Sequence, residues 1–310
     1  MRSASLIGAV VVTFHPDGRA LERWDAIKAE VGRMVVVDNG SSRGVIDRLR
    51  HWTTANDATL VSNPTNRGLA MALNQGIEWC ERAGCEWVIT FDQDSTPLPG
   101  FAAAGLATAR AAVDRERVAV VGARTSDECT GREDLWLRPA WHGFRRCRCD
   151  REDLAEVTFV ITSGALTRVA AWRDLGGFDD RLFIDYIDHD FCLRARRRGW
   201  RTMVSAGARL SHNLGAKREV AVAGRRLHPT FHSATRHYYM MRNRILMWKR
   251  HGWRYPHWWL FDACFGLMNF VRVLLAEDRR VDKARAALEG LWDGLCGRGG
   301  ARRTAPSARR

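Results

Sequence analysis

The sequence predicts an α/β protein with a Rossmann-like, mostly parallel sheet flanked by helices and followed by a helical extension. Between residues 6 and 212, short apolar runs of strand length alternate with stretches of helical period. Such alternation is typical of parallel strands joined by right-handed helical crossovers. Beyond His228 the strand pattern stops, and the chain becomes helical and amphipathic.

The predicted strands are apolar runs that end in polar or turn-forming residues. They span residues 6–14, 33–38, 59–62, 87–91, 118–122, 156–162 and 202–212. The predicted helices lie at residues 20–31, 45–53, 68–83, 101–113, 167–175 and 185–198. Pro97 and Pro99 follow the fourth strand, and we expect them to prevent strand pairing and helix formation there.

Composition indicates a soluble globular protein, because 46% of the 310 residues are hydrophobic and 27% are charged. The eight cysteines have no disulfide-framework spacing, and residues 1–14 have the pattern of a core strand and not of a signal peptide. We therefore expect a cytoplasmic protein with free thiols.

The net charge of +14 is unevenly distributed. Residues 1–193 carry 23 Lys and Arg against 28 Asp and Glu, whereas residues 194–310 carry 26 against 7. A basic half predicts an anionic partner, which leaves nucleic acid, a membrane surface and a phosphate-bearing substrate open.

Two carboxylates follow the apolar strand at residues 87–91. Asp92 and Asp94 are two residues apart at its carboxyl end, where ligands bind in open α/β sheets. Carboxylates suit Mg²⁺ or Mn²⁺, which also bind substrate phosphates. A surface turn with solvated acids is the alternative for such a short motif.

Residues 124–155 are polar and Arg-rich and interrupt the alternation of strands and helices. We interpret them as a variable loop over the site. A zinc site is the alternative, although Cys-x-Cys matches the usual ligand spacing poorly. Its ligands would be Cys129, His142, Cys147 and Cys149.

Seven segments together resemble the inverting family 2 glycosyltransferases of GT-A fold, which move sugars from nucleotide diphosphates. They follow the family's order and cover most of the chain. The segments are VVTFHPD at 11–17, VVVDNGS at 35–41, NRGLAMALNQGI at 66–77, FDQDS at 91–95, TSGALTR at 162–168, GGFDDRLFIDYIDHDFCLRARRRGW at 176–200 and RHYYMMRNR at 236–244.

Within that family the chain looks most like bacterial rhamnosyltransferases that build O-antigen, capsule or cell-wall glycans, because of FDQDS and the FIDYID segment. The resemblance implies transfer of a sugar, with dTDP-L-rhamnose as the expected donor and a glycan or lipid-linked molecule as acceptor. A UDP-sugar transferase using galactofuranose or glucose is the alternative within the fold.

The resemblance also implies the residues that bind the donor. Thr13 and Asp38 match positions that contact the base, and an Asp there can accept the imide N–H of thymine or uracil. Asn66 and Arg67 begin a helix whose amino end and cation suit the diphosphate; a simple helix cap is the alternative for Asn66.

In the same way, Asp92 matches a ribose-binding position, and Asp94 matches the ligand of a Mg²⁺ or Mn²⁺ cofactor. His212 matches a family position that completes the metal shell. Ser163 and Gly164 match residues near the donor sugar, where a glycine permits close backbone contact.

Asp188 matches the catalytic base of the family. The usual Glu-Asp-x-Asp pattern is Ile187-Asp188-His189-Asp190 here, so the Glu is missing. Asp185 and His189 are the candidates to replace its acceptor contact. We expect Asp190 to be structural and to hold a nearby Arg.

The resulting domain prediction has three parts. Residues 1–228 form the catalytic domain, with a nucleotide-binding half at 1–122 and an acceptor half at 156–228. Residues 229–296 form a helical region, and residues 297–310 form a disordered basic tail.

Aromatic and basic residues alternate in the helical region, as they do on helices that lie in a bilayer interface. The apolar run at 258–276 contains Asp262 and Arg272, so we expect it to lie on the cytoplasmic face of the inner membrane and not to cross it. A helical subdomain packed on the core is the alternative. Nucleic-acid binding through the basic half is the alternative from another class, but no nucleic-acid-binding module is recognisable and we expect no nucleic-acid partner.

Overall fold

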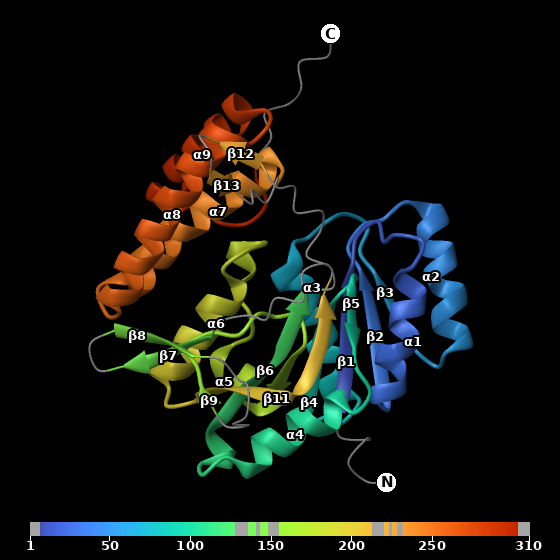
Figure 1. The fold of residues 1–310 in the computed structure, drawn as a ribbon. Coiled ribbons are helices and arrows are strands. Elements are labelled where there is room, and N and C mark those ends of the chain that lie inside the picture. Colours follow the sequence, from blue (N-terminus) through green and yellow to red (C-terminus); the bar gives the residue numbers. More distant parts are fainter. Residues whose placement is uncertain are drawn as a thin grey trace. The chain divides into compact units, whose positions relative to one another are not determined.

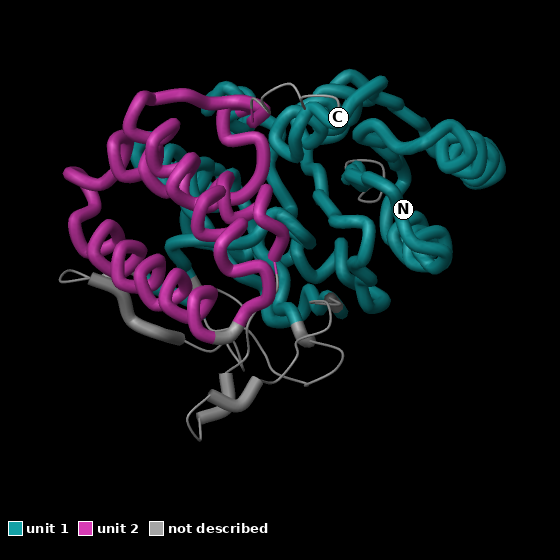
Figure 2. Tube along the Cα trace, turned by 90° about the horizontal axis from the view of Figure 1, so that it is seen from above, with its two compact units in different colours: residues 1–179, 187–214 teal, residues 180–186, 215–310 magenta. Residues whose placement is uncertain are grey.

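The computed structural model describes residues 7–127, 136–140, 143–147, 155–212, 220–222, 225–227 and 232–302. The chain forms two compact units (Figures 1 and 2). The first comprises residues 1–179 and 187–214, and the second comprises residues 180–186 and 215–310. The short segment 180–186 therefore belongs to the helical unit, although it lies within the predicted catalytic domain.

A mixed nine-stranded sheet organises the first unit, in the order β3-β2-β1-β4-β10-β6-β11-β5 with β9 paired to β11. Strands β1, β2, β3, β4, β6 and β11 run parallel, whereas β5, β9 and β10 run antiparallel to their neighbours. The strands are β1 (Ile7–Thr13), β2 (Arg33–Asp38), β3 (Thr59–Ser62), β4 (Trp87–Asp92), β5 (Ser95–Pro97), β6 (Val118–Asp127), β9 (Ala155–Glu156), β10 (Ala165–Arg168) and β11 (Arg201–His212). This confirms the predicted mostly parallel α/β sheet.

Helices cover both faces of this sheet. They are α1 (Ala20–Glu30), α2 (Arg43–Ala55), α3 (Leu69–Arg82), α4 (Phe101–Ala111), α5 (Val169–Leu175) and α6 (Ile187–Arg197). Successive strand side chains point to opposite faces, so Ala9 and Val11 join the core under α1, α2 and α4. Val10 faces α3. A Cβ on Gly76 of α3 would lie 2.3 Å from the Cγ1 of Val10, so the helix can approach the strand this closely only with a glycine there.

Two sequence predictions about secondary structure are wrong. The apolar segment 156–162 is not a strand beyond Glu156; the strand that enters the sheet is β10, three residues after the predicted segment. Pro97 does not prevent strand pairing. Strand β5 is at the edge of the sheet and pairs with β11 on one side, and an edge strand tolerates a proline, which has no amide hydrogen to donate. Within the predicted variable loop, β7 (Trp136–Ala140) and β8 (Gly143–Cys147) form a hairpin. The side chains considered for zinc lie outside the described residues.

The second unit is built on α7 (Ala234–Met247), a π-helical turn (Trp248–Gly252), α8 (Pro256–Ala276) and α9 (Arg280–Leu295), with a small ribbon of β12 (Val220–Val222) and β13 (Arg225–Leu227). Glycines let α9 approach α7 closely, since a Cβ on Gly290 would lie 2.2 Å from the Tyr238 carbonyl oxygen. The predicted disordered tail is wrong for its first residues. The Gly300 amide donates to the Arg181 carbonyl, and the Arg302 amide donates to the Tyr239 hydroxyl.

Candidate functional site

Three of the predicted donor-binding residues meet at one edge of the sheet. Strand register places Thr13 of β1 opposite Asp38 of β2, and Val12 of β1 opposite Asp92 of β4. Because these strands are parallel neighbours, their carboxyl ends form a continuous edge that carries two acids and a hydroxyl.

Gln93 ties the end of β4 to the end of β1. Its side-chain oxygen accepts hydrogen bonds from the Thr13 hydroxyl (3.0 Å) and from the Phe14 amide (2.9 Å). Sequence reasoning overlooked this residue, although it stands between the two acids. It fixes the loop that carries Asp92 and Asp94.

Asp38 is fully buried, and only one of its two carboxylate oxygens is hydrogen-bonded within the part of the chain that the structure describes. Its Oδ2 accepts hydrogen bonds from the amides of Gly40 (3.2 Å) and Ser41 (2.9 Å), so the predicted turn role is present. Its Oδ1 is buried and has no hydrogen-bond partner among the described residues. An orphaned carboxylate oxygen is costly unless a ligand donates to it.

Asn39 links this edge to the start of α3. The Asn39 side chain donates to the Asn66 side chain (3.1 Å) and accepts from the Arg67 amide (3.0 Å), while its own amide bonds the Thr13 carbonyl. Asn66 also accepts from the amide of Gly68, the residue just before the helix begins at Leu69. Asn66 therefore shapes the turn before the helix, and the Arg67 side chain is exposed.

Ser163 and Gly164 reach the same edge from the turn before β10. The hydroxyl oxygens of Ser163 and Ser95 are 2.6 Å apart, and the Asp92 amide donates to Ser163 at 3.4 Å. Gly164 has a φ of +75°, and a Cβ there would lie 3.0 Å from both Ala123 Cβ and Leu210 Cδ2. A larger residue would displace this turn.

The predicted metal ligands approach each other through the backbone. His212 of β11 pairs with Ser95 of β5, the residue next to Asp94. The His212 side chain lies outside the described residues, and among the side chains that are described no three acidic, His or Cys groups form a metal site. A carboxylate such as that of Asp94 is the ligand type that Mg²⁺ and Mn²⁺ prefer.

Asp188 lies in the first turn of α6. Its Oδ1 accepts from the His189 amide (2.8 Å) and is 2.9 Å from the His189 Nδ1. Burial raises the pKa of Asp188, but the charge and hydrogen bonds of His189 outweigh it and hold the pKa below its usual value. The carboxyl group is therefore ionised at neutral pH.

The neighbouring acids behave differently. Asp190 is fully buried, and its Oδ2 accepts a 2.6 Å hydrogen bond from Arg194 Nε, which confirms the predicted structural ion pair. Arg194 also bonds the carbonyls of Leu175 and Gly177. Asp185 forms an ion pair with Arg236 (3.0 Å) within the second unit, and His189 contacts Asp188 within the first.

The sheet with its helices on both faces has the GT-A fold, and the class of protein is a glycosyltransferase. The chain belongs to glycosyltransferase family 2, whose family model matches residues 10–176. It is 26% identical over 310 residues to the dTDP-rhamnosyl transferase RfbF of Shigella flexneri, covering 94% of this chain and 96% of that protein. It is also 29% identical over 136 residues to glucomannan 4-beta-mannosyltransferase 2 of Arabidopsis thaliana, covering 43% and 24% of the two chains.

Solved structures share the fold at low sequence identity. TarS 1–349 of S. aureus in complex with UDP-GlcNAc aligns with a TM-score of 0.59 and 17% identity, covering 93% of this chain and 80% of that one. This chain covers only 42% of the longer TarS chain. Mannosyltransferase PcManGT of Pyrobaculum calidifontis in complex with GDP-Man and Mn²⁺ aligns with a TM-score of 0.53 and 15% identity, covering 93% and 87%.

Proposed function

We propose that this protein is an inverting glycosyltransferase that moves L-rhamnose from dTDP-L-rhamnose to a glycan or lipid-linked acceptor in surface polysaccharide synthesis. The observation that carries the proposal is the buried, unpartnered Asp38 Oδ1 at the sheet edge that also bears Asp92. The imide N–H of a thymine base would satisfy that oxygen. Similarity to a dTDP-rhamnosyl transferase over nearly the whole chain supports the choice of donor.

The donor would lie along the carboxyl ends of β1, β2 and β4. Thr13 and Asp38 bind the base, Asp92 binds the ribose, and the turn that contains Asn66 and Arg67 faces the diphosphate. Ser163 and Gly164 border the sugar. Gln93 and Asn39 keep these segments together through the hydrogen bonds given above.

Asp188 acts as general base and takes the proton of the acceptor hydroxyl while that oxygen attacks the anomeric carbon in one in-line displacement. His189 keeps the carboxylate ionised and oriented. A Mg²⁺ or Mn²⁺ ion held by Asp94 and His212 would offset charge on the departing diphosphate. The GDP-Man and Mn²⁺ complex of PcManGT supports this metal requirement.

The test is a screen of dTDP-, UDP- and GDP-sugars for acceptor-stimulated release of nucleoside diphosphate by the purified protein. The proposal expects dTDP-L-rhamnose to give the highest kcat/KM. Preference for UDP-galactofuranose or UDP-glucose would favour the alternative within the fold. Absence of turnover with every donor, together with salt-sensitive binding to oligonucleotides, would favour the nucleic-acid alternative.

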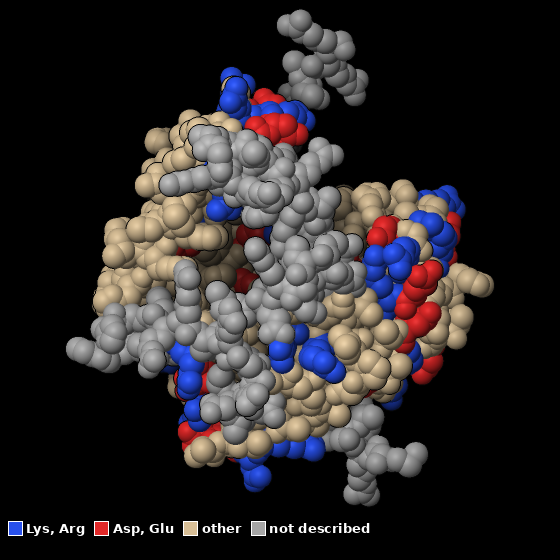
Figure 3. All heavy atoms as spheres, in the orientation of Figure 1, with Lys and Arg blue, Asp and Glu red and all other residues tan. Residues whose placement is uncertain are grey.

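We also propose that the protein works at the cytoplasmic face of the membrane, with α8 and α9 against anionic lipid. In Figure 3 the side of the second unit formed by α8 is mostly free of charged side chains. The exposed apolar residues of α8 recur at helical spacing, and α9 adds a second stripe. They include Leu260, Leu267, Val271 and Leu274 on α8, and Val281, Leu288, Trp292 and Leu295 on α9. Soluble surfaces rarely expose so continuous an apolar patch.

The acid in the apolar run of α8 faces inward. Asp262 is buried, and its Oδ2 accepts from Arg244 Nε (3.0 Å) and Trp248 Nε1 (2.8 Å), while its Oδ1 accepts from the Tyr186 hydroxyl (2.7 Å). By length and composition alone, residues 256–275 could cross a bilayer, and 22% of an 18-residue window within them is buried. The buried polar contacts of Asp262 favour a helix that stays with α7 and lies on the surface.

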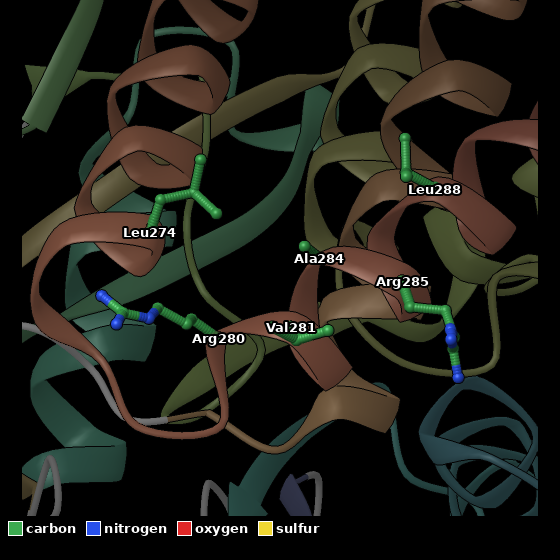
Figure 4. A pocket seen from close by; sticks show the side chains of 6 residues that line it. All are labelled: Leu274, Arg280, Val281, Ala284, Arg285 and Leu288. Carbon is green, nitrogen blue, oxygen red and sulfur yellow. The ribbon is translucent and has the colours of Figure 1, made fainter.

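This face has a groove between α8 and α9, with positively charged side chains beside it (Figure 4). Leu274, Val281, Ala284 and Leu288 line it, and Arg280 and Arg285 flank it. Neither guanidinium has an ion-pair partner among the described side chains. Apolar walls beside two cations match a lipid chain and its phosphate, whereas a symmetric contact with a second copy would bring like charges together.

A further inference from the structure

The geometry points to Arg242 and Asn243 of α7 as positioning residues for Asp188, acting through the segment 181–186. This inference rests on the proposed role of Asp188 as the base. The segment belongs to the second unit and continues directly into Ile187, the first residue of α6. The segment is therefore joined through a single residue to Asp188, in the first turn of α6.

Asn243 holds the carbonyls of this segment. Its Nδ2 donates to the carbonyl oxygens of Leu182 (2.7 Å), Ile184 (2.7 Å) and Asp185 (3.0 Å). Asn243 has no exposed surface. One buried amide group therefore bonds three carbonyls of this segment, of which that of Leu182 also accepts from the Ile184 amide (2.7 Å).

Arg242 holds the same segment from the adjacent position. Its Nη2 donates to the carbonyls of Arg181 (3.0 Å) and Leu182 (3.0 Å), and its Nε donates to the Asn243 side-chain oxygen (3.0 Å). That last bond leaves the Asn243 amide nitrogen free to face the carbonyls. The guanidinium lies 4.8 Å from the centre of the Tyr239 ring.

The held backbone is strained. Phe183, Asp185 and Tyr186 each have a φ of +64°, a region that residues other than glycine rarely adopt. Three such residues within four positions do not persist unless neighbouring groups determine them. The clamp defined by Arg242 and Asn243 supplies those groups, and Phe183 also stacks on Tyr239 with ring centroids 4.8 Å apart.

Fold stability alone accounts poorly for this arrangement. Arg242 is 1% exposed, and all its hydrogen-bond acceptors given above are neutral. Burial lowers its pKa, which reflects the cost of keeping a cation away from water. A buried cation bound to the backbone of a strained segment two residues before a general base fits a role in placing that base.

The experiment uses the full-length protein with Asn243→Leu, which keeps the size of the side chain and removes the donors. Arg242→Lys is the second variant, because lysine keeps the charge but cannot reach Arg181, Leu182 and Asn243 together. Arg279→Gln, which removes an exposed ion pair with Asp282 in the same unit, is the matched control. Hydrogen exchange is followed at amides 182–190, and kcat, KM and the donor dissociation constant are measured.

We expect exchange at amides 182–190 to rise at least about tenfold in both clamp variants, with β1 and β4 unchanged. The transfer kcat should fall about 10²-fold, as for a misplaced reacting group, while the donor dissociation constant stays within about threefold of wild type. Wild-type exchange at Asp188 and His189 in both clamp variants, or a kcat equal to that of the control, would overturn the inference. The exchange result stands even if wild type uses none of the expected donors, so it separates this inference from the proposed reaction.

Discussion

The imidazole of His189 lies against the ring of Phe159, with centroids 4.5 Å apart and planes inclined by 30°. The contact fixes the His189 ring. Phe159 lies four residues before Ser163, in the segment that leads to the turn before β10. The contact also holds Nδ1 at hydrogen-bond distance from Asp188. The two sides of the site, α6 and the turn before β10, are therefore connected through one aromatic pair within the first unit.

His189→Phe would keep this ring contact and remove the Nδ1 donor. Since His189 lowers the pKa of Asp188, its loss should raise that pKa. The base must be ionised, so activity is lost as pH falls through the pKa, and the acidic limb of the kcat/KM profile should move to higher pH. A profile that superimposes on wild type would separate His189 from the titration of the base.

Asp188→Asn should lower kcat by about 10²–10⁴-fold, the usual contribution of a general base. Donor affinity, measured by calorimetry with dTDP-L-rhamnose, should stay within a few-fold of wild type because the proposed base would contact the acceptor and not the donor. Asp190→Asn is the comparison. Removing the charge that pairs with Arg194 should lower the free energy of unfolding by about 3 kcal/mol, because the pair is buried. The prediction fails if Asp190→Asn, and not Asp188→Asn, reproduces the catalytic defect at full stability.

Asp94→Ala should abolish the response of the enzyme to added Mn²⁺ or Mg²⁺. Wild-type turnover should be lost in EDTA and restored by excess metal, because the proposed ion would neutralise charge on the leaving diphosphate. The variant should remain inactive at all metal concentrations while its thermal stability stays close to wild type, since Asp94 is only partly buried. Full activity of Asp94→Ala in the presence of EDTA would disprove the metal requirement.

Asp38→Asn should weaken binding of dTDP about 10–100-fold, equivalent to about 1.4–2.7 kcal/mol. The amide oxygen can still accept from Gly40 and Ser41, so the turn is retained. The amide nitrogen would then replace Oδ1 and place a donor against the imide N–H of the base. Asp47→Asn, on the exposed surface of α2, is the control. Equal dTDP affinity in both variants would show that Asp38 does not bind the thymine ring.

Replacement of Leu260, Leu267 and Leu274 by Gln together should release the protein from anionic liposomes in a flotation assay. The wild type should float at low salt and less at high salt, because surface attraction is screened within about 8 Å at physiological ionic strength. Val113→Gln, at an exposed apolar site in the first unit, should float like wild type. If the triple replacement leaves flotation unchanged, this face is not the membrane anchor. If the protein is a dimer in solution and only the triple replacement dissociates it, the face is a contact between two copies.

The parallel sheet and its acidic edge could be predicted from local patterns. Apolar runs ending in polar turns define β1, β2 and β4, because a buried parallel strand excludes polar residues along its length and ends where they begin. The same reasoning placed Asp38, Asp92 and Asp94 at strand ends, where the register brings the first two to one edge.

Only the tertiary structure decided which apolar segment enters the sheet and what holds the chain before Asp188. Residues 157–162 are as apolar as a strand, yet β10 takes the place between β4 and β6, since strand pairing depends on distant partners. Likewise, Arg242 and Asn243 belong in sequence to a basic helix, and nothing local shows that they bind carbonyls some sixty residues earlier. Local chemistry determines where strands and helices begin and end; long-range hydrogen bonds and packing determine which of them meet.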